Sequence, residues 1–544
     1  MKIKFIAVVF VLSLFSVNAQ LKVADVKVKA KNPSPYPINK NISGGFVEML
    51  RDFVNGPLGI WGQDFYDRGF DHTSNWQIPV YWDKFYQSDT INGRWQMVEG
   101  GYNKNGKFYQ KMTNPNETGL VGLSQLVYVS HDVESIFYVW AKSVGSSVNL
   151  KIKLINPIDI SVLFEKEIGS TSETWQKFPT KIPNYLNVHK YILAIYFEGK
   201  GELDIDEASL MPDNNIDGIR KEYFELFKLW NPGVIRYPGG GFADVRDNNW
   251  YEGIGEIDQR KSPLFHGVGF NVQRLDWGTD EFIQFCKNLN IEPHIVVNLA
   301  ENKPQDAANW VEYCNGDTNT YFGRIRANNG HPEPYNVNLW EIGNEQYGDE
   351  IEMAQKYLTY YDLMKKVDSN ITIMIDGNVW VTLDNFDILL NAVKNKCDVY
   401  GWHWAQGGVP KRQLHNDSIY YNMVAGPEKM KEIIEEIDKK ISANNINKNL
   451  KQGITEWWLS YIDNYEWLDT TAREQSLEAG LSNAGYLQTF TQYQELFNIA
   501  ERTVGLCNIR TDTISGTGQK KIYGTPAFYS QVMMSRHSGN TYLN

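Results

Sequence analysis

The most informative run in this sequence is Val337-Asn338-Leu339-Trp340-Glu341-Ile342-Gly343-Asn344-Glu345, an apolar segment that stops on an Asn-Glu pair. A short apolar run of this kind predicts a buried strand whose end carries the Glu345 carboxyl group to the rim of a sheet. Later in the chain, Gln452-Gly453-Ile454-Thr455-Glu456 again ends a β-prone run on a glutamate. Each run therefore predicts a strand that presents a carboxyl group at its end.

Strand-like runs of this type recur along the chain, and segments with helical periodicity separate them. The helical segments include Asp280–Cys286, Ala307–Cys314, Met353–Val367 and Glu428–Ile441. An alternation of eight strands and helices predicts a parallel (β/α)8 (TIM) barrel, an α/β fold with its functional side chains at the carboxyl ends of the strands. The eight predicted strands are Gly44–Glu48, Val234–Gly240, Pro293–Ala300, Asn338–Glu345, Ile371–Gly377, Val399–Trp404, Gln452–Trp457 and Gly505–Thr513.

In this barrel Glu345 closes the fourth strand and Glu456 closes the seventh. A single glutamate at a strand end is more often a solvated edge residue or the partner of an arginine. Two glutamates that face one cleft are what hydrolysis of a glycosidic bond requires, because one protonates the leaving oxygen and the other attacks or activates water. The sequence therefore predicts a glycosidase. Glu341 lies on the same side of its strand as Glu345, and we expect it to pair with an arginine.

Further motifs occur along residues 216–530. They are Arg236-Tyr237-Pro238-Gly239-Gly240-Gly241-Phe242-Ala243-Asp244 with Trp250 and Gly253-Ile254-Gly255, then Val296–Leu299, Trp310–Gly316, Trp340–Glu345 and Ile454–Trp457. Together these motifs resemble glycoside hydrolase family 51, the clan-A α-L-arabinofuranosidases. The resemblance implies a retaining exo-glycosidase that releases arabinofuranose from arabinan or arabinoxylan.

The resemblance also implies roles for individual residues. Glu345 matches the general acid/base and Glu456 the nucleophile, so Glu345 is expected to start neutral and Glu456 ionised. Arg236 matches an arginine that keeps the nucleophile ionised, Asn344 an asparagine that contacts a sugar hydroxyl, and Glu48 a substrate-binding glutamate. The expected substrate groove, built from strand ends, consists of Glu48, Arg236, Asn298, Asn344, His403 and Trp404. Catalysis of this kind uses no cofactor and no metal.

Three positions depart from the family pattern. Met49 stands where many members have His, Gly241 where Asn or Cys is common, and Ala405 where a tyrosine is usual. These positions line the subsite for the sugar ring, so another clan-A activity is an alternative, such as a β-xylosidase, an endoglucanase or a different furanosidase. A non-catalytic glycan-binding protein and a docking scaffold for a partner protein are the remaining alternatives. The presence of both glutamates counts against the glycan-binding alternative.

Residues 61–212 have a different pattern from the barrel. Apolar and polar residues alternate in short runs such as Ser135–Ala141 and Tyr191–Phe197, which predicts an all-β sandwich. The closing segment Glu202–Pro212 is similar to the last strand of jelly-roll carbohydrate-binding modules, and this similarity implies a structural calcium ion near Asp206. A solvated acidic edge is the alternative. We expect a jelly-roll inserted into the first β/α connection of the barrel.

The remaining features concern location and partners. Residues 1–19 predict a cleaved signal peptide, and so a secreted or periplasmic protein with no membrane span. The net charge of −12 argues against nucleic acid as a partner, which leaves an oligosaccharide or polysaccharide. The four cysteines lack Cys-x-x-Cys spacing and predict buried free thiols, and the oligomeric state is left open.

The expected organisation is a signal peptide (1–19), the first barrel strand region (20–60), the insert (61–212), the barrel (213–530) and a short tail (531–544). Members of the family continue into a C-terminal β-sandwich, which we do not expect in residues 531–544.

Overall fold

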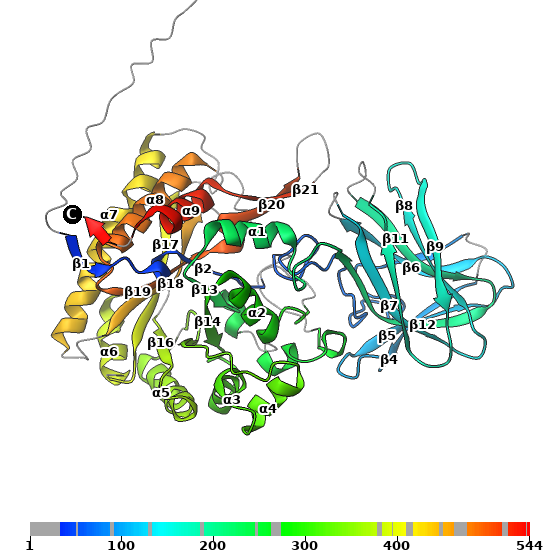
Figure 1. Ribbon diagram of the computed structural model, residues 1–544, viewed down its shortest axis with the longest axis horizontal. Helices are drawn as coiled ribbons and strands as arrows, with labels where there is room; N and C mark the ends of the chain where they lie inside the picture. The colour runs from blue at the N-terminus through cyan, green and yellow to red at the C-terminus, as the bar shows by residue number, and fades with distance from the viewer. Residues whose placement is uncertain are drawn as a thin grey trace, which may run out of the picture.

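A closed barrel and a two-sheet β domain form the two parts of the protein in the computed structural model (Figure 1). The structure describes residues 33–49, 53–87, 92–128, 133–184, 190–244, 249–262, 274–346, 348–377, 383–393, 395–409, 417–444, 450–461, 476–513, 520–539 and 541–543. The expected (β/α)8 barrel with an additional all-β domain is confirmed. The predicted signal peptide, residues 1–19, lies outside the described residues.

Parallel strands close the barrel in the order β13-β14-β15-β16-β17-β18-β19-β2. Their burial explains their composition, because residues such as Ile235, Trp340 and Ile373 are fully buried between the barrel and its helices. The bounds are β2 (Gly44–Phe46), β13 (Val234–Tyr237), β14 (Glu292–Val297), β15 (Leu339–Ile342), β16 (Thr372–Asp376), β17 (Val399–Val409), β18 (Lys451–Tyr461) and β19 (Phe497–Thr503).

Helices surround the barrel, and their ends carry recognisable capping residues. The Asp349 side chain accepts hydrogen bonds from the backbone N–H groups of Ile351 and Glu352, and Thr525 caps a helix that begins with Pro526. The helices are α1 (Lys221–Trp230), α2 (Thr279–Leu289), α3 (Pro304–Asn315), α4 (Tyr321–Asn328), α5 (Glu350–Val367), α6 (Leu383–Val393), α7 (Asp417–Ala443), α8 (Leu477–Gln492) and α9 (Pro526–His537).

The prediction for the eighth barrel strand is wrong. Gly505–Thr513 is not a barrel strand: Val504–Asn508 forms a π-helix, and β20 (Ile509–Thr513) pairs antiparallel with β21 (Lys520–Gly524). The barrel is closed instead by β19, which pairs with β18 and β2. This strand carries Glu501, whose buried carboxylate lies 3.0 Å from His294 Nδ1 on β14. A charged residue inside a short strand hides the apolar pattern on which the prediction depended.

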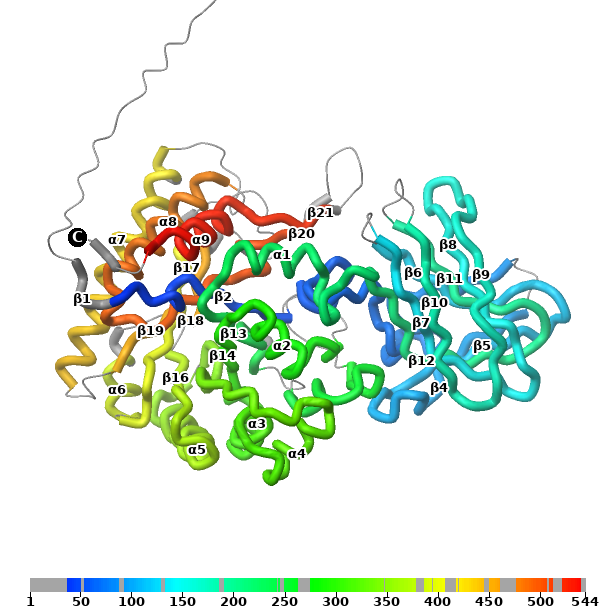
Figure 2. Tube along the Cα trace, viewed as in Figure 1, coloured from blue at the N-terminus to red at the C-terminus, as the bar shows by residue number. Residues whose placement is uncertain are grey.

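The insert is a sandwich of two five-stranded antiparallel sheets, β10-β7-β12-β5-β4 and β3-β6-β11-β8-β9. Alternate residues of strands such as β7 face a separate core that contains Phe137, Val139 and Leu193. In Figure 2 the chain leaves the barrel after β2, forms this domain and returns at α1. The strands are β3 (Asp83–Tyr86), β4 (Arg94–Glu99), β5 (Phe108–Asn114), β6 (Leu120–Tyr128), β7 (Ser135–Ser143), β8 (Asn149–Ile155), β9 (Val162–Ser170), β10 (Gln176–Ile182), β11 (Lys190–Glu198) and β12 (Gly201–Pro212).

A buried cluster of charges joins the insert to the barrel. Arg68 lies 2.8 Å from Glu207 of the insert and 3.0 and 2.7 Å from Asp258 and Asp276 of the barrel. Arg274 lies 2.9 Å from the same Glu207. Arg68 brings the pKa values of Asp258 and Asp276 below their ordinary values despite burial, whereas burial raises the pKa of Glu207 to about 7.

The calcium ion expected near Asp206 remains a prediction. In the structure, the Asp206 carboxylate accepts hydrogen bonds from the backbone N–H groups of Asn103 and Glu207. The neighbouring Glu207 carboxylate is held by the two arginines of the junction. The acidic segment is therefore buried at the junction rather than a solvated edge.

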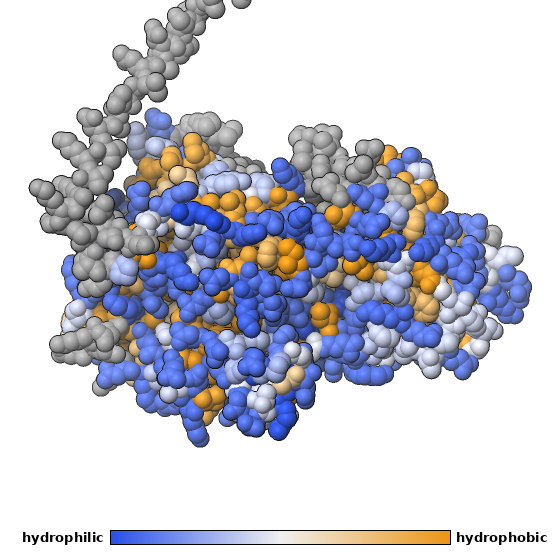
Figure 3. Space-filling model, viewed as in Figure 1, coloured by the Kyte–Doolittle hydropathy of each residue, from blue (hydrophilic) through white to orange (hydrophobic). Residues whose placement is uncertain are grey.

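Other predictions concern the chain as a whole. Cys286, Cys314 and Cys397 are buried free thiols, as expected, whereas the Cys507 side chain lies outside the described part of the structure. At the chain ends, β1 (Pro33–Pro37) pairs antiparallel with β22 (Thr541–Leu543). Among the described residues, no helix is both long enough and apolar enough to cross a bilayer. On the face in Figure 3, apolar residues are scattered among polar ones.

Candidate active site

The carboxyl ends of the barrel strands bring Glu345, Glu456 and His403 together. One oxygen of each carboxylate and one ring nitrogen of His403 all lie within 4.8 Å of one another. A separation of this size fits retaining glycosidases, whose carboxyl groups stand about 5–5.5 Å apart, better than inverting ones at about 6.5–9.5 Å. The Glu345 side chain is 28% exposed and that of Glu456 only 11%, so Glu345 is the more accessible of the two.

Glu345 is delivered by a turn with unusual backbone geometry. Gly343 has a φ of +88° and Glu345 itself a φ of +50°, a region that residues with a side chain seldom adopt. The neighbouring Asn344 donates its backbone N–H to the Asp244 carboxylate over 2.7 Å. Backbone strain of this kind is concentrated at functional sites, and here it directs the Glu345 side chain after β15 ends.

Arg236 on β13 connects three groups of the site. Its Nη1 lies 3.6 Å from Glu456 Oε2, and its Nη2 donates to Asn344 Oδ1 over 2.8 Å. Its Nε forms an ion pair with Glu341, which confirms that Glu341 is an inward partner for an arginine. A planar guanidinium group whose three nitrogens each face a different partner is well suited to fix the positions of these partners.

His403 on β17 lies between the two glutamates and a third acid. Its Nδ1 is 3.1 Å from Glu345 Oε1 and 3.8 Å from Glu456 Oε2, and its Nε2 is 3.6 Å from Asp376 Oδ1. Burial and the charge of Glu341 raise the pKa of Asp376 well above its ordinary value. Sequence reasoning missed Asp376, although it ends the fifth strand and the rule that found Glu345 applies to it equally.

The glycine-rich motif after β13 makes room for Glu48. Gly240 has a φ of +58°, and a Cβ atom added there would lie 1.7 Å from Glu48 Oε2. Glycine is therefore required at this position by both the backbone and the contact. The charge of Glu48 also acts on the pKa of Glu456, which places this residue near the pair of glutamates as expected.

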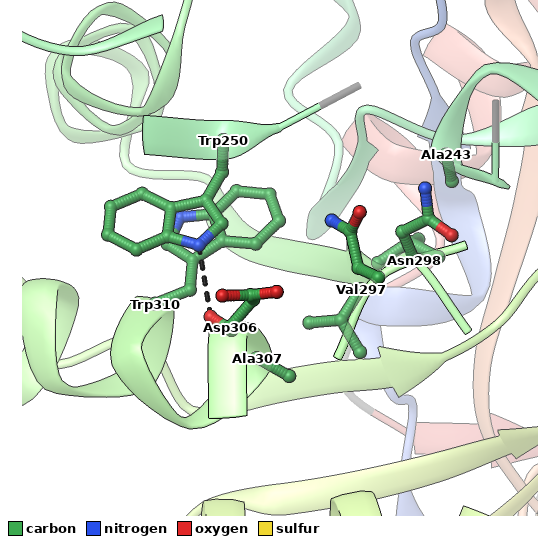
Figure 4. Close-up of a pocket in the computed structure, with 9 residues that line it drawn as sticks. Ala243, Trp250, Val297, Asn298, Asp306, Ala307 and Trp310 are labelled. Atoms are coloured by element: carbon green, nitrogen blue, oxygen red, sulfur yellow. Dashed lines mark hydrogen bonds between the residues drawn. The ribbon is translucent and has the colours of Figure 1, made fainter. Parts of the chain in front are cut away.

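Asn298 and Trp404, two further residues of the predicted groove, contact neighbouring elements of the barrel. Asn298 follows β14 and lines a cavity of about 10 Å³ beside the stacked rings of Trp250 and Trp310, large enough for about one water molecule (Figure 4). Trp404 is half-buried and donates its indole N–H to the Tyr486 hydroxyl of α8 over 3.0 Å. The structure thus directs the Trp404 indole N–H toward a surrounding helix.

Asp244 is a second residue that sequence reasoning did not single out as functional. Its carboxylate accepts hydrogen bonds from the backbone N–H groups of Leu299, Ala300 and Asn344 at 2.8, 3.2 and 2.7 Å. Burial raises its pKa to about 6. The side chain therefore ties the ends of β14 and β15 together and positions Asn344.

The pKa shifts of the two glutamates run in opposite directions. Burial raises the pKa of Glu456 well above its ordinary value, and the charges of Glu345 and Glu48 add to this, whereas Arg236 opposes it. Burial also acts to raise the pKa of Glu345, but His403 and Arg236 bring this pKa below its ordinary value. The sequence led us to expect the opposite directions, and the deeper burial of Glu456 accounts for its raised pKa.

Known proteins that are similar to this chain include several α-L-arabinofuranosidases. A family model described as the alpha-L-arabinofuranosidase 1 domain matches residues 226–420. Probable alpha-L-arabinofuranosidase C of Aspergillus clavatus is 35% identical over 180 residues, which cover 32% of this chain and 34% of that protein. The chain therefore spans about a third of the length of such relatives. An intracellular exo-alpha-L-arabinofuranosidase of Bacteroides ovatus is 27% identical over 370 residues, covering 63% and 68%.

Solved structures show the same architecture. An arabinose-bound GH51 α-L-arabinofuranosidase has the same fold, with a TM-score of 0.72 at 15% identity over 95% of this chain and 83% of that one. An arabinose complex of the Thermotoga maritima α-L-arabinofuranosidase has a TM-score of 0.51 at 26% identity, covering 60% and 66%. Barrel and motifs thus define a glycoside hydrolase scaffold. Within that class, the chain is similar to the α-L-arabinofuranosidases, whose domain model matches residues 226–420.

Proposed function

We propose that the protein is a retaining α-L-arabinofuranosidase that releases arabinofuranose from plant arabinan or arabinoxylan. The observation that carries the proposal is the pairing of Glu345 and Glu456, with oxygens within 4.8 Å of each other beside Arg236. The similarity to α-L-arabinofuranosidases across the barrel supports the choice of sugar.

The proposed reaction has two displacements. In the first, a Glu456 oxygen forms a bond to the anomeric carbon while the glycosidic bond breaks, and Glu345 gives its proton to the departing oxygen. In the second, the Glu345 carboxylate takes a proton from water, whose oxygen replaces Glu456 on the sugar. Because the configuration inverts twice, the released sugar has the configuration of the substrate.

This cycle needs the proton on Glu345 when the substrate is bound, whereas the pKa directions favour Glu456 in the free site. We infer that substrate binding moves this proton from Glu456 to Glu345. His403 Nδ1 lies 3.1 Å from Glu345 and 3.8 Å from Glu456, so it contacts both of the carboxyl groups between which the proton moves. The Arg236 charge then stabilises the ionised Glu456.

A panel of aryl glycosides tests the proposal directly. We expect rapid release of the chromophore from the α-L-arabinofuranoside and, with methanol as acceptor, a methyl glycoside of retained configuration. A product of inverted configuration would contradict the double displacement. Absence of turnover on every aryl glycoside would instead favour a non-catalytic glycan-binding protein.

A different clan-A activity is the second candidate, and one observation favours it. Among the residues that the structure describes, no heavy atom lies within 4 Å of a Cβ atom placed on Gly241, so a larger residue at this position would fill space that is open here. The panel should therefore include β-xylosides and other furanosides. Preference for one of these over the arabinofuranoside would change the assigned sugar but keep both glutamates.

Export and cofactor use are separate parts of the proposal. We propose that residues 1–19 direct export to the periplasm or the medium, which N-terminal sequencing of the mature protein tests. We also propose that turnover needs no metal, and that any calcium ion binds only near Asp206. Treatment with a chelator should then leave the turnover of an aryl glycoside unchanged, and a loss of turnover would show a catalytic metal.

A further inference from the structure

A hollow of about 610 Å³ lies where the insert meets the barrel. This volume is within the range of about 300–1,000 Å³ that is typical of small-molecule sites. Both parts of the protein contribute to its wall, the insert through residues 71–108 and the barrel through the connection after β13. The lining residues that matter here are His72, Trp76, Asn105, Lys107, Asn249 and Glu252.

Trp76 is the most unusual residue of this wall. Its side chain is large and apolar, yet the residue is 61% exposed. Its backbone φ is +59°, a conformation that bulky residues rarely adopt and that persists only where the surroundings hold it. An exposed aromatic side chain that is held in a rarely adopted backbone conformation indicates a functional site.

The surroundings hold Trp76 in this conformation. Its backbone N–H donates to Thr73 Oγ1 over 2.9 Å, and its carbonyl accepts from the N–H of Met97 over 3.0 Å. Its ring meets Phe108 edge to face at 5.4 Å between centroids. One edge of the indole is thus supported by the insert while the residue stays open to the hollow.

The charges around the hollow are balanced. His72 lies 2.9 Å from Asp67, and Lys261 forms an ion pair with Glu252. Amide side chains of Asn105 and Asn249 add neutral donors and acceptors. An exposed aromatic face among amides and paired charges fits a neutral polyhydroxylated ligand better than a polyanion, because a sugar ring stacks on the face while its hydroxyl groups bond to the rim.

The broad face of the neighbouring sheet, by contrast, is closed by the barrel. On β7, the Tyr138 hydroxyl and the Trp140 indole N–H both donate to Asp258 of the barrel, over 2.7 and 3.0 Å. Tyr102 stacks on Trp140 with 3.5 Å between ring centroids. These aromatic residues are engaged at the junction, whereas Trp76 is exposed.

We propose that the Trp76 hollow is an accessory binding site for neutral sugar units of the polysaccharide substrate. The barrel side of the hollow belongs to the connection that runs on from Asp244, the residue that positions Asn344. A chain bound here would be held by the same connection that supports the active site. The choice of a plant polysaccharide rests on the proposed function, whereas the binding of a neutral glycan at Trp76 does not.

The first test measures binding without turnover. In full-length protein silenced by Glu456→Gln, a neutral arabinoxylan oligosaccharide is titrated calorimetrically against the parent, Trp76→Ala and, as matched control, Tyr321→Ala, an aromatic residue that is 63% exposed on α4. We expect Trp76→Ala to bind about tenfold more weakly and Tyr321→Ala to bind like the parent. Equal affinities in all three proteins would overturn the proposal.

The second test uses no substituted protein, so a variant that fails to fold cannot affect its result. The unsubstituted full-length protein is oxidised with N-bromosuccinimide, with and without the oligosaccharide, and oxidation of the Trp76 peptide is measured by mass spectrometry. We expect the oligosaccharide to protect Trp76 and an acidic polygalacturonate oligomer to leave it exposed. Lack of protection at a saturating concentration of the neutral oligosaccharide would overturn the site. Because neither readout requires hydrolysis, failure of the proposed activity would leave both results interpretable.

Discussion

Arg236 Nη1 lies 3.6 Å from Glu456 Oε2, and this contact joins the second barrel strand to the seventh at the centre of the site. The same guanidinium group donates to Asn344 and pairs with Glu341. One buried cation therefore sets the positions of the proposed nucleophile and of a group that flanks the proposed acid.

Replacement of Arg236 should be severe even when the charge is kept. We expect Arg236→Lys to lower kcat/KM by about 10²–10³-fold, because an ammonium group cannot hold the three partners of the planar fork. Arg236 lowers the pKa of Glu456, so a more distant charge should raise that pKa and move the acid limb of the pH profile to higher pH. Steady-state kinetics across pH measure both effects, and an unchanged acid limb would contradict the contact's role.

Glu345→Gln should discriminate between substrates. Aryl glycosides with good leaving groups should lose far less activity in the first displacement than natural oligosaccharides, because only a basic departing oxygen needs the acid. Pre-steady-state measurement of chromophore release separates the two displacements. Equal losses on both kinds of substrate would remove Glu345 from the acid role.

The same variant should also shift the pH profile. The charge of Glu345 raises the pKa of Glu456, so its removal should lower that pKa and extend activity on the aryl glycoside to lower pH. Glu345→Asp, which keeps a charge, is the matched control and should shift the acid limb less. An upward shift in Glu345→Gln would show that the two carboxyl groups do not interact as described.

Asp376 offers a test of the electrostatics around His403. Because burial and Glu341 raise its pKa, Asp376 should already be neutral at working pH, and Asp376→Asn should lower kcat/KM only a few-fold. Asp376→Ala removes the group that faces His403 Nε2 and should cost more. If the asparagine variant were as impaired as the alanine variant, Asp376 would act as a charged carboxylate.

The buried junction should matter for stability. Arg68→Ala leaves Glu207, Asp258 and Asp276 without their shared partner and should lower the free energy of unfolding by about 3–5 kcal/mol. Lys200→Ala, which removes an exposed surface pair with Glu117, is the control and should cause no measurable change. Urea unfolding measures both, and a neutral effect of Arg68→Ala would show that the junction contributes little.

Most of the barrel could be predicted because its strands are short apolar runs that end in polar groups. Asn338–Glu345 and Gln452–Trp457 have this form, and both lie in barrel strands or at their ends. The eighth strand could not be predicted in this way, because Glu501 is buried and charged and finds its partner His294 only in the folded barrel. The order of apolar and polar residues along the chain does not show which residues pair across the barrel.

The candidate site, too, could be predicted only in part from the sequence. Arg236 and Glu345 lie near the end of β13 and just after β15, as the rule for barrels predicts, whereas β17 and β18 continue to Val409 and Tyr461, beyond His403 and Glu456. The directions of the two glutamate pKa shifts could not be predicted, because they depend on how deeply each carboxyl group is buried. The role of Asp244 depends on backbone N–H groups from two other segments, which no motif reports.

Chemical rescue of Glu456→Ala is the most direct test of the central claim, that Glu456 is the nucleophile of a retaining glycosidase. Without the carboxylate no glycosyl-enzyme can form, so turnover of an aryl α-L-arabinofuranoside should fall by several orders of magnitude while the circular dichroism spectrum is unchanged. Added azide should restore part of the turnover and yield a glycosyl azide of inverted configuration. Unchanged activity without azide, or a rescued product of retained configuration, would contradict the assignment.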